Sequence, residues 1–153
     1  MIRRALAVIV TLTTGWVSGC GTSPITSLRL ERTLAPTFAN LVHAQLARVG
    51  LPTVAASDIK VTAACYRVDQ RRSGAGDWLC TLVWSGPNGA TLHDKYDVSV
   101  SSDGCYTATV EGSEAQLGGP IVRTTDGRAV RNLLHAFDGC FDTTVNAAGT
   151  TGK

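Results

Sequence analysis

The chain has 153 residues, and its 14 Lys and Arg against 12 Asp and Glu give a formal net charge of +2 at pH 7. This length corresponds to one domain of ordinary size. A nucleic-acid-binding protein needs clustered cations to neutralise phosphates, so the near balance of charges argues against that class.

Residues 1–19 have the layout of a signal peptide. Arg3 and Arg4 precede thirteen uncharged residues, 5–17, and the small pair Ser18 and Gly19 follows them. Because a transmembrane helix needs about twenty apolar residues, this shorter run predicts a cleaved signal and not a permanent span. Removal of the segment takes away both arginines and leaves 12 basic and 12 acidic side chains, so the mature chain has no excess of basic charge.

The run "VSGC", residues 17–20, resembles the lipobox of bacterial lipoproteins. The resemblance covers residues 1–20. It implies that the Cys20 thiol receives a diacylglycerol, that cleavage occurs just before it, and that the new amino terminus is often acylated. Val17 departs from the commonest lipobox, which has Leu there. The alternative is an ordinary secretory signal cleaved near Gly19, which would leave Cys20 as a reactive spare thiol.

The lipobox interpretation predicts a chain anchored in the cell membrane by acyl chains on Cys20, facing away from the cytoplasm. Residues 20–30 are expected to be the lipidated cysteine and a tether, residues 31–142 one α+β ectodomain, and residues 143–153 a flexible tail. The eleven Arg against three Lys suggest a GC-rich genome, and the ectodomain resembles in general terms small uncharacterised lipoproteins of actinobacteria. No motif in residues 21–153 carries a role over from that resemblance.

One amphipathic helix is expected at the start of the ectodomain. Its apolar residues recur at intervals of three and four, which places them on one helical face. They are Leu34, Phe38, Leu41, Val42, Leu46 and Val49. Thr33 is a candidate N-cap, and Gly50 with Pro52 ends the helix.

Four strands are predicted next, over residues 59–68, 78–85, 91–101 and 105–111. A hairpin that pairs Cys65 with Cys80 gives the first two strands one shared apolar face. The segments "PNG" (residues 87–89) and "SDG" (residues 102–104) fit three-residue turns with a left-handed glycine in third place, and both preserve that face. We therefore expect the helix to pack on a four-stranded antiparallel meander.

Two disulfides are expected. Cys65, Cys80, Cys105 and Cys140 are separated by 15, 25 and 35 positions and form no Cys-x-x-Cys pair, which argues against a zinc or redox site. The strand map pairs Cys65 with Cys80 on the core face. Cys105 points to the other face, so it is paired with Cys140 in a C-terminal segment, residues 117–142, which is expected to cover that face.

No strong catalytic, metal or cofactor signature occurs in the sequence, and no cofactor or metal is expected. His93 and Asp94 are adjacent, but neighbours on a strand point to opposite faces and cannot form a catalytic pair there. Asp94 falls on the core face opposite Leu82 and near Tyr96, where it is either a structural carboxylate or a general base with a raised pKa.

Two classes of function follow. The first is a surface-anchored, non-enzymatic binding or scaffold module of the cell envelope, whose partner is an unidentified envelope protein or small ligand. The second is a small-ligand pocket or enzyme on a helix-covered curved sheet, with Asp94 and Tyr96 as weak catalytic candidates. The pair Arg71 and Arg72 is interpreted as a solvated loop tip in preference to a contact with phosphate or lipid headgroups. A pocket with Asp94 in its wall would favour the second class.

Overall fold

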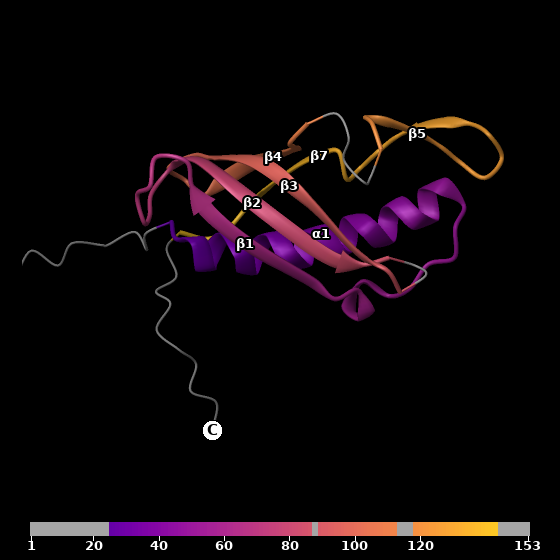
Figure 1. Ribbon diagram of the computed structural model, residues 1–153, viewed down its shortest axis with the longest axis horizontal. Helices are drawn as coiled ribbons and strands as arrows, with labels where there is room; N and C mark the ends of the chain where they lie inside the picture. The colour runs from indigo at the N-terminus through magenta and orange to yellow at the C-terminus, as the bar shows by residue number, and fades with distance from the viewer. Residues whose placement is uncertain (1–24, 87–88, 113–117, 144–153) are drawn as a thin grey trace, which may run out of the picture.

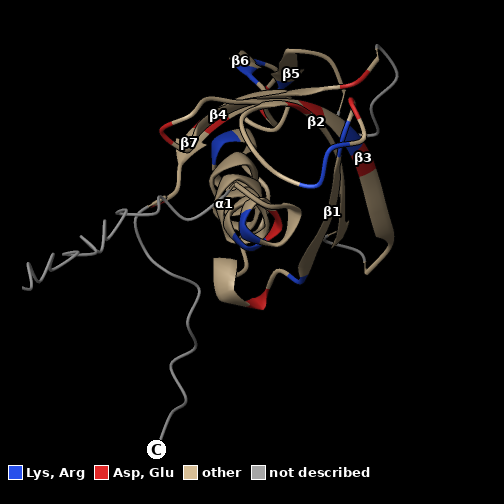
Figure 2. Cartoon of the chain, turned by 90° about the vertical axis from the view of Figure 1, so that its left-hand side faces the viewer, with Lys and Arg blue, Asp and Glu red and all other residues tan. Residues whose placement is uncertain are grey.

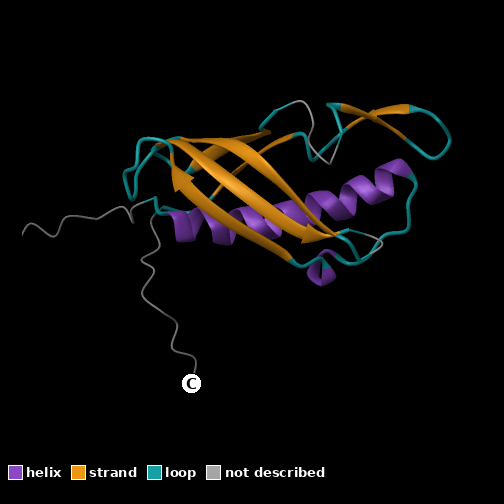
Figure 3. Ribbon diagram, viewed as in Figure 1, coloured by secondary structure: helices purple, strands orange, loops and turns teal. Residues whose placement is uncertain are grey.

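A computed structural model of the chain describes residues 25–86, 89–112 and 118–143. One helix lies along one face of a five-stranded antiparallel sheet with the strand order β1-β2-β3-β4-β7, and a separate two-stranded hairpin follows β4 in the chain (Figures 1 and 3). The elements are α1 (Ser27–Val49), the 3-10 turn η1 (Ala56–Asp58), β1 (Val61–Arg67), β2 (Gly76–Ser85), β3 (Thr91–Val100), β4 (Cys105–Val110), β5 (Ile121–Arg123), β6 (Ala129–Arg131) and β7 (Ala136–Cys140). The α+β class, with an N-terminal helix on an antiparallel meander, is confirmed.

Helix α1 begins earlier than the sequence indicated. Its N-cap is Thr26, whose hydroxyl oxygen accepts a hydrogen bond from the Arg29 backbone N–H at 3.3 Å. Thr33, the expected cap, lies inside the helix and donates to the Arg29 carbonyl at 3.0 Å. Residues 27–30 are therefore the first turn of the helix and not part of a tether. The predicted end is confirmed, since Gly50 caps the helix in the left-handed conformation at φ 79°.

The predicted apolar stripe of α1 faces the sheet. The buried residues of the helix are Leu30, Leu34, Phe38, Ala39, Val42, Gln45 and Leu46. They recur at helical spacing and pack on the inner side of the meander, which curves around the helix (Figure 2). Leu30, missed as a stripe residue because it was assigned to the tether, is fully buried.

The predicted register of the meander is confirmed. Cys65 pairs with Cys80 across β1 and β2, and Leu82 pairs with Asp94 across β2 and β3. The turn between β3 and β4 closes as expected, because the Gly104 N–H donates to the Ser101 carbonyl at 3.1 Å and Gly104 has φ 87°. An ideal Cβ on Gly104 would lie 2.5 Å from the Phe141 carbonyl oxygen. Glycine is therefore required both by the positive φ and by the lack of room for a side chain.

The C-terminal segment was predicted wrongly as a cover for the outer face of the sheet. It instead adds β7 beside β4 as a fifth strand, and Leu134 and Phe137 are buried on the helix side. The outer face stays open, with Tyr66 59% and Val68 63% exposed. The error came from the assumption that an outward-facing cysteine needs a partner in a second layer. A cysteine directly opposite on the adjacent strand, here Cys140 on β7, can form the disulfide equally well.

The segment between β4 and β7 packs against the end of α1. The buried Gln45 side chain accepts a hydrogen bond from the Leu133 N–H at 2.8 Å, and the Thr125 N–H donates to the Val49 carbonyl at 2.8 Å. Asn132, 2% exposed, donates through Nδ2 to the Gly119 carbonyl at 3.1 Å and accepts from the Leu134 N–H at 3.0 Å. These bonds fix the hairpin β5–β6 at the opposite end of the helix from Thr26.

Candidate functional site

The two predicted disulfides are both present. Cys65 is bonded to Cys80, and Cys105 to Cys140. Each joins residues that lie directly opposite on neighbouring strands. Disulfides persist outside the reducing cytosol, so the pair indicates that this domain matures in an extracytoplasmic compartment.

Cys20, the predicted lipidation site, lies outside the described residues, as do the expected signal peptide and most of the tail. The described chain starts at Ile25, which is 4% exposed. Its carbonyl accepts a hydrogen bond from the Gly74 N–H at 2.7 Å, and Thr26 forms a β-bridge with Ser73. The chain therefore enters the fold beside the turn that joins β1 to β2. Within the described part of the chain, no helix is long and apolar enough to span a bilayer.

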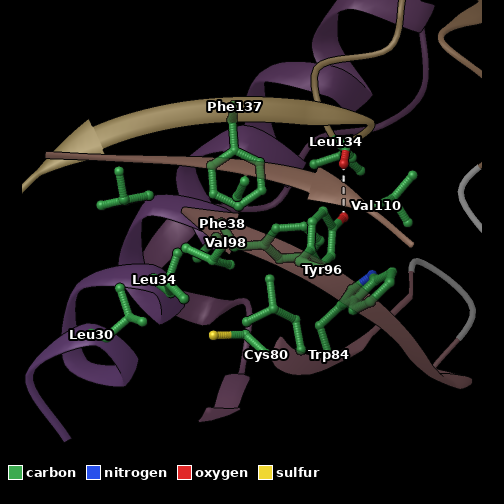
Figure 4. Close-up of a cluster of buried hydrophobic side chains, with 14 of the residues drawn as sticks. Leu30, Leu34, Phe38, Cys80, Trp84, Tyr96, Val98, Val110, Leu134 and Phe137 are labelled. Carbon is green, nitrogen blue, oxygen red and sulfur yellow. Dashed lines mark hydrogen bonds between the residues drawn. The ribbon is translucent and has the colours of Figure 1, made fainter. Parts of the chain in front are cut away.

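Asp94 lies where the register predicted it, on the helix side of the sheet opposite Leu82, and is 8% exposed. Tyr96 lies two residues along the same face and is fully buried. Its hydroxyl donates to the Leu134 carbonyl at 2.7 Å (Figure 4). Burial, with a smaller effect of the Asp94 charge, raises the pKa of the Tyr96 hydroxyl. Tyr96 is thus a neutral donor held on a backbone carbonyl, which suits a structural role better than proton transfer.

The space between helix and sheet around Tyr96 is filled by aromatic rings (Figure 4). Phe38 from α1 lies at the centre, with its ring centroid 4.9 Å from Trp84, 5.8 Å from Tyr96 and 6.1 Å from Phe137. Tyr96 and Phe137 also meet, edge to face, at 5.4 Å. Edge-to-face packing of this kind leaves little room for a ligand against Asp94.

Asp94 does not line any of three hollows at the described surface of the molecule. The first, about 510 Å³, lies at the end of the sheet near Cys105 and Cys140. The second, about 450 Å³, lies between the start of α1 and the β1–β2 turn. The third, about 400 Å³, lies along β2, β3 and β4 and includes Asp77, Asp97 and Thr107. All three are open to solvent at the surface of the sheet or its edges.

The histidines do not form a site. His43 donates through Nδ1 to the Val54 carbonyl at 2.7 Å, so it ties the last turns of α1 to the following loop. His93 is exposed on the outer face, the opposite side of β3 from Asp94, as strand geometry requires. Among the described residues, no group of three His, Cys, Asp or Glu side chains is placed to hold a metal ion.

Arg67 is a buried, hydrogen-bonded side chain that was not predicted from the sequence. It is 6% exposed and sits at the end of β1 opposite Trp78, with its guanidinium carbon 5.7 Å from the indole centroid. It donates to both carboxylate oxygens of Asp69, at 2.8 and 2.6 Å, and to the carbonyls of Ser73 and Ala75, at 3.0 and 2.6 Å. The strand alternation could have indicated this burial. Arg67 lies two residues after Cys65 on β1, so its side chain is on the same, core-facing side and must either bury its guanidinium or bend away from the core.

This network organises the β1–β2 turn. The guanidinium of Arg67 holds the pKa of Asp69 at about 2, chiefly through the hydrogen bonds between them. Gly76 has φ 127°, and a Cβ there would lie 2.8 Å from Arg67 Nη2, so glycine makes room for the guanidinium. Arg71 and Arg72 are held on the outside of this turn, where both are exposed.

No protein-family model, curated protein or solved structure matches this chain.

Proposed function

We propose that the protein is a lipoprotein anchored through Cys20 on the extracytoplasmic face of the cell membrane, and that it is a non-enzymatic binding module of the envelope. The anchor rests on the lipobox-like run that ends at Cys20. The two disulfides are consistent with that location.

The observation that carries the binding role is the contrast between the two faces of the sheet. The inner face is closed by α1 and packed with rings around Phe38, which disfavours the alternative of an enzyme that uses Asp94. The outer face is left exposed by the described residues and is mixed in polarity. Its exposed residues on β3 and β4 are Thr91, His93, Lys95, Asp97, Ser99, Thr107 and Thr109.

A face of this kind suits a polar macromolecular partner. Non-obligate protein–protein interfaces have about the polarity of ordinary protein surface, and complementary charges orient the partners. Lys95 and Asp97 place charges of both signs on one strand. The hollow beside Asp97 provides a concave surface into which a partner side chain could fit. The proposed partner is an envelope protein that contacts β2, β3 and β4 from outside.

Site-specific photo-cross-linking in intact cells tests this role. A photoreactive residue at Lys95 should give one discrete adduct, and the same residue at Asn40, on the exposed side of α1, is the matched control. The adduct at Lys95 should survive Asp94→Asn, because the contact is outside the core. Equal labelling from both positions, or loss of the adduct in Asp94→Asn, would contradict the proposal.

A further inference from the structure

The point where the tether joins the domain fixes which end of the molecule is near the membrane. Ile25 and Thr26 are bonded to Gly74 and Ser73, so the chain enters beside the β1–β2 turn. Cys20 is five positions before Ile25, and five residues reach at most about 17 Å when fully extended. If Cys20 is acylated, as the proposed function holds, the β1–β2 turn lies within that distance of the lipid headgroups.

The surface at this end combines apolar and basic side chains. We define the anchor-proximal patch as Tyr66, Val68, Arg71 and Arg72. Tyr66 and Val68 are 59% and 63% exposed, and the Arg71 side chain is 76% exposed. Tyr66, Arg71 and Arg72 also line the 450 Å³ hollow next to Ser27, the first residue of α1. Aromatic, aliphatic and arginine side chains together are the composition that favours the membrane–water interface.

The charge of the patch is carried by Arg71 and Arg72. Asp69, the nearest carboxylate, is already engaged by both the Nε and Nη2 atoms of Arg67, and its ion pair with Arg71 is longer, at 3.5 Å. The acidic Asp103 and Asp142 of the same end of the molecule belong to the β3–β4 turn and to the chain after β7. Figure 2, which looks at this end, shows the β1–β2 turn and the β4–β7 region on different sides, with further acidic positions on β2 and β3 near the turn. Asp77, exposed at the second position of β2, is one such carboxylate beside the patch.

The turn is also held in a fixed shape, so binding would not have to order it. Arg67 bonds Asp69, Ser73 and Ala75 from within, and Asp69 accepts the Arg71 backbone N–H at 3.1 Å. A preformed surface loses less conformational entropy on contact than a flexible loop.

We infer that the anchor-proximal patch docks on the anionic lipid surface of the membrane that carries the anchor. Arg71 and Arg72 contact lipid phosphates, and Tyr66 and Val68 lie at the headgroup level. The contact holds β1 toward the membrane and leaves the hairpin β5–β6 pointing away from it. Each arginine near an anionic surface should favour the docked state about fivefold.

Fluorescence quenching in reconstituted vesicles tests the inference. The mature full-length lipoprotein carries an environment-sensitive fluorophore at Val68→Cys or, as a matched control, at Val54→Cys. Both valines are exposed, at 63% and 51%, and Val54 follows the far end of α1, about 34 Å along a 23-residue helix. The vesicles contain phosphatidylglycerol or only phosphatidylcholine, with headgroup-attached nitroxide quenchers. The label at Val68 should be quenched in anionic vesicles and much less in neutral ones, and the label at Val54 in neither.

Charge variants separate docking from simple tethering. Arg71→Gln with Arg72→Gln should weaken quenching at Val68, whereas Arg48→Gln with Arg131→Gln, two exposed arginines at the far end, should not. Gln is chosen because it adds no charge beside Asp69. Equal quenching at Val68 and Val54, or quenching indifferent to Arg71 and Arg72, would overturn the docking inference even though the protein floats with the vesicles. A protein that lacks acyl chains and does not float would instead refute the anchor.

Discussion

Arg67 Nε and Nη2 donate to the two carboxylate oxygens of Asp69 at 2.8 and 2.6 Å, and Asp69 lies two residues before the exposed Arg71. The same guanidinium lies over Trp78 and bonds the carbonyls of Ser73 and Ala75. One buried cation therefore connects the core, the β1–β2 turn and the entry point of the chain.

Acid should weaken the fold through Asp69. Its pKa is about 2 in the folded protein against 3.8 for an ordinary Asp, so the stabilisation is complete above about pH 4 and is lost as the pH falls toward 2. Melting temperature measured from pH 6 to pH 2 should fall in the wild type. Asp69→Asn should melt lower at pH 6, and the gap between the two should close as the pH approaches 2. A gap that is constant across this range would show that the pair is not linked to protonation.

Phe38 should be the most costly single truncation in the helix. Its ring touches Trp84, Tyr96 and Phe137 in a site with no exposure, so Phe38→Ala should lower the free energy of unfolding by about 3–5 kcal/mol. Urea denaturation gives the value. Leu28→Ala, at a helix residue that is 52% exposed, is the control and should change stability by less than about 0.5 kcal/mol. Similar losses in the two variants would mean that the space between helix and sheet is not closely packed.

Tyr96→Phe should reveal both the hydrogen bond and the raised pKa. Loss of the donor to the Leu134 carbonyl should cost about 1–3 kcal/mol, because the carbonyl is left buried. The folded state keeps Tyr96 neutral, so this stabilisation is present below about pH 10, the ordinary pKa of Tyr, and decreases at higher pH. Unfolding curves between pH 8 and 11 should thus be less pH-dependent in Tyr96→Phe. If the free energy of unfolding depended on pH between 8 and 11 equally in the wild type and in Tyr96→Phe, the Tyr96 hydroxyl would not be buried as described.

The two disulfides should be separable by mapping and by stability. Non-reducing digestion should give Cys65 linked to Cys80 and Cys105 linked to Cys140. From loop length alone, Cys65→Ala with Cys80→Ala should cost about 3 kcal/mol, and Cys105→Ala with Cys140→Ala about 4 kcal/mol. A peptide that joins Cys65 to Cys105 would refute the register. Melting that is indifferent to reductant would show that neither bridge stabilises the fold.

Local pattern was sufficient to predict the meander, because period-two alternation and two glycine-ended turns specify the same face. That register placed Asp94 in the core and paired all four cysteines correctly. The start of α1 was missed because Leu30 was read as part of a polar tether, and Thr26 gives no stronger capping signal than Thr33. The role of β7 was missed because its burial is decided by a sheet edge distant in sequence, which periodicity does not encode. Arg67 was missed for a different reason, because the conformation of the β1–β2 turn decides which Asp69 oxygens and backbone carbonyls accept from its guanidinium.

The proposed anchor is tested by the mass and lipid content of the amino-terminal peptide of the mature protein, isolated from its membrane. We predict a peptide that begins at Cys20, carries a diacylglycerol on its sulfur and incorporates labelled palmitate. Cys20→Ser should be neither labelled nor retained as the mature anchored form. A mature protein that begins at another residue, or that carries Cys20 with a free thiol and no acyl chain, would contradict the proposed anchor.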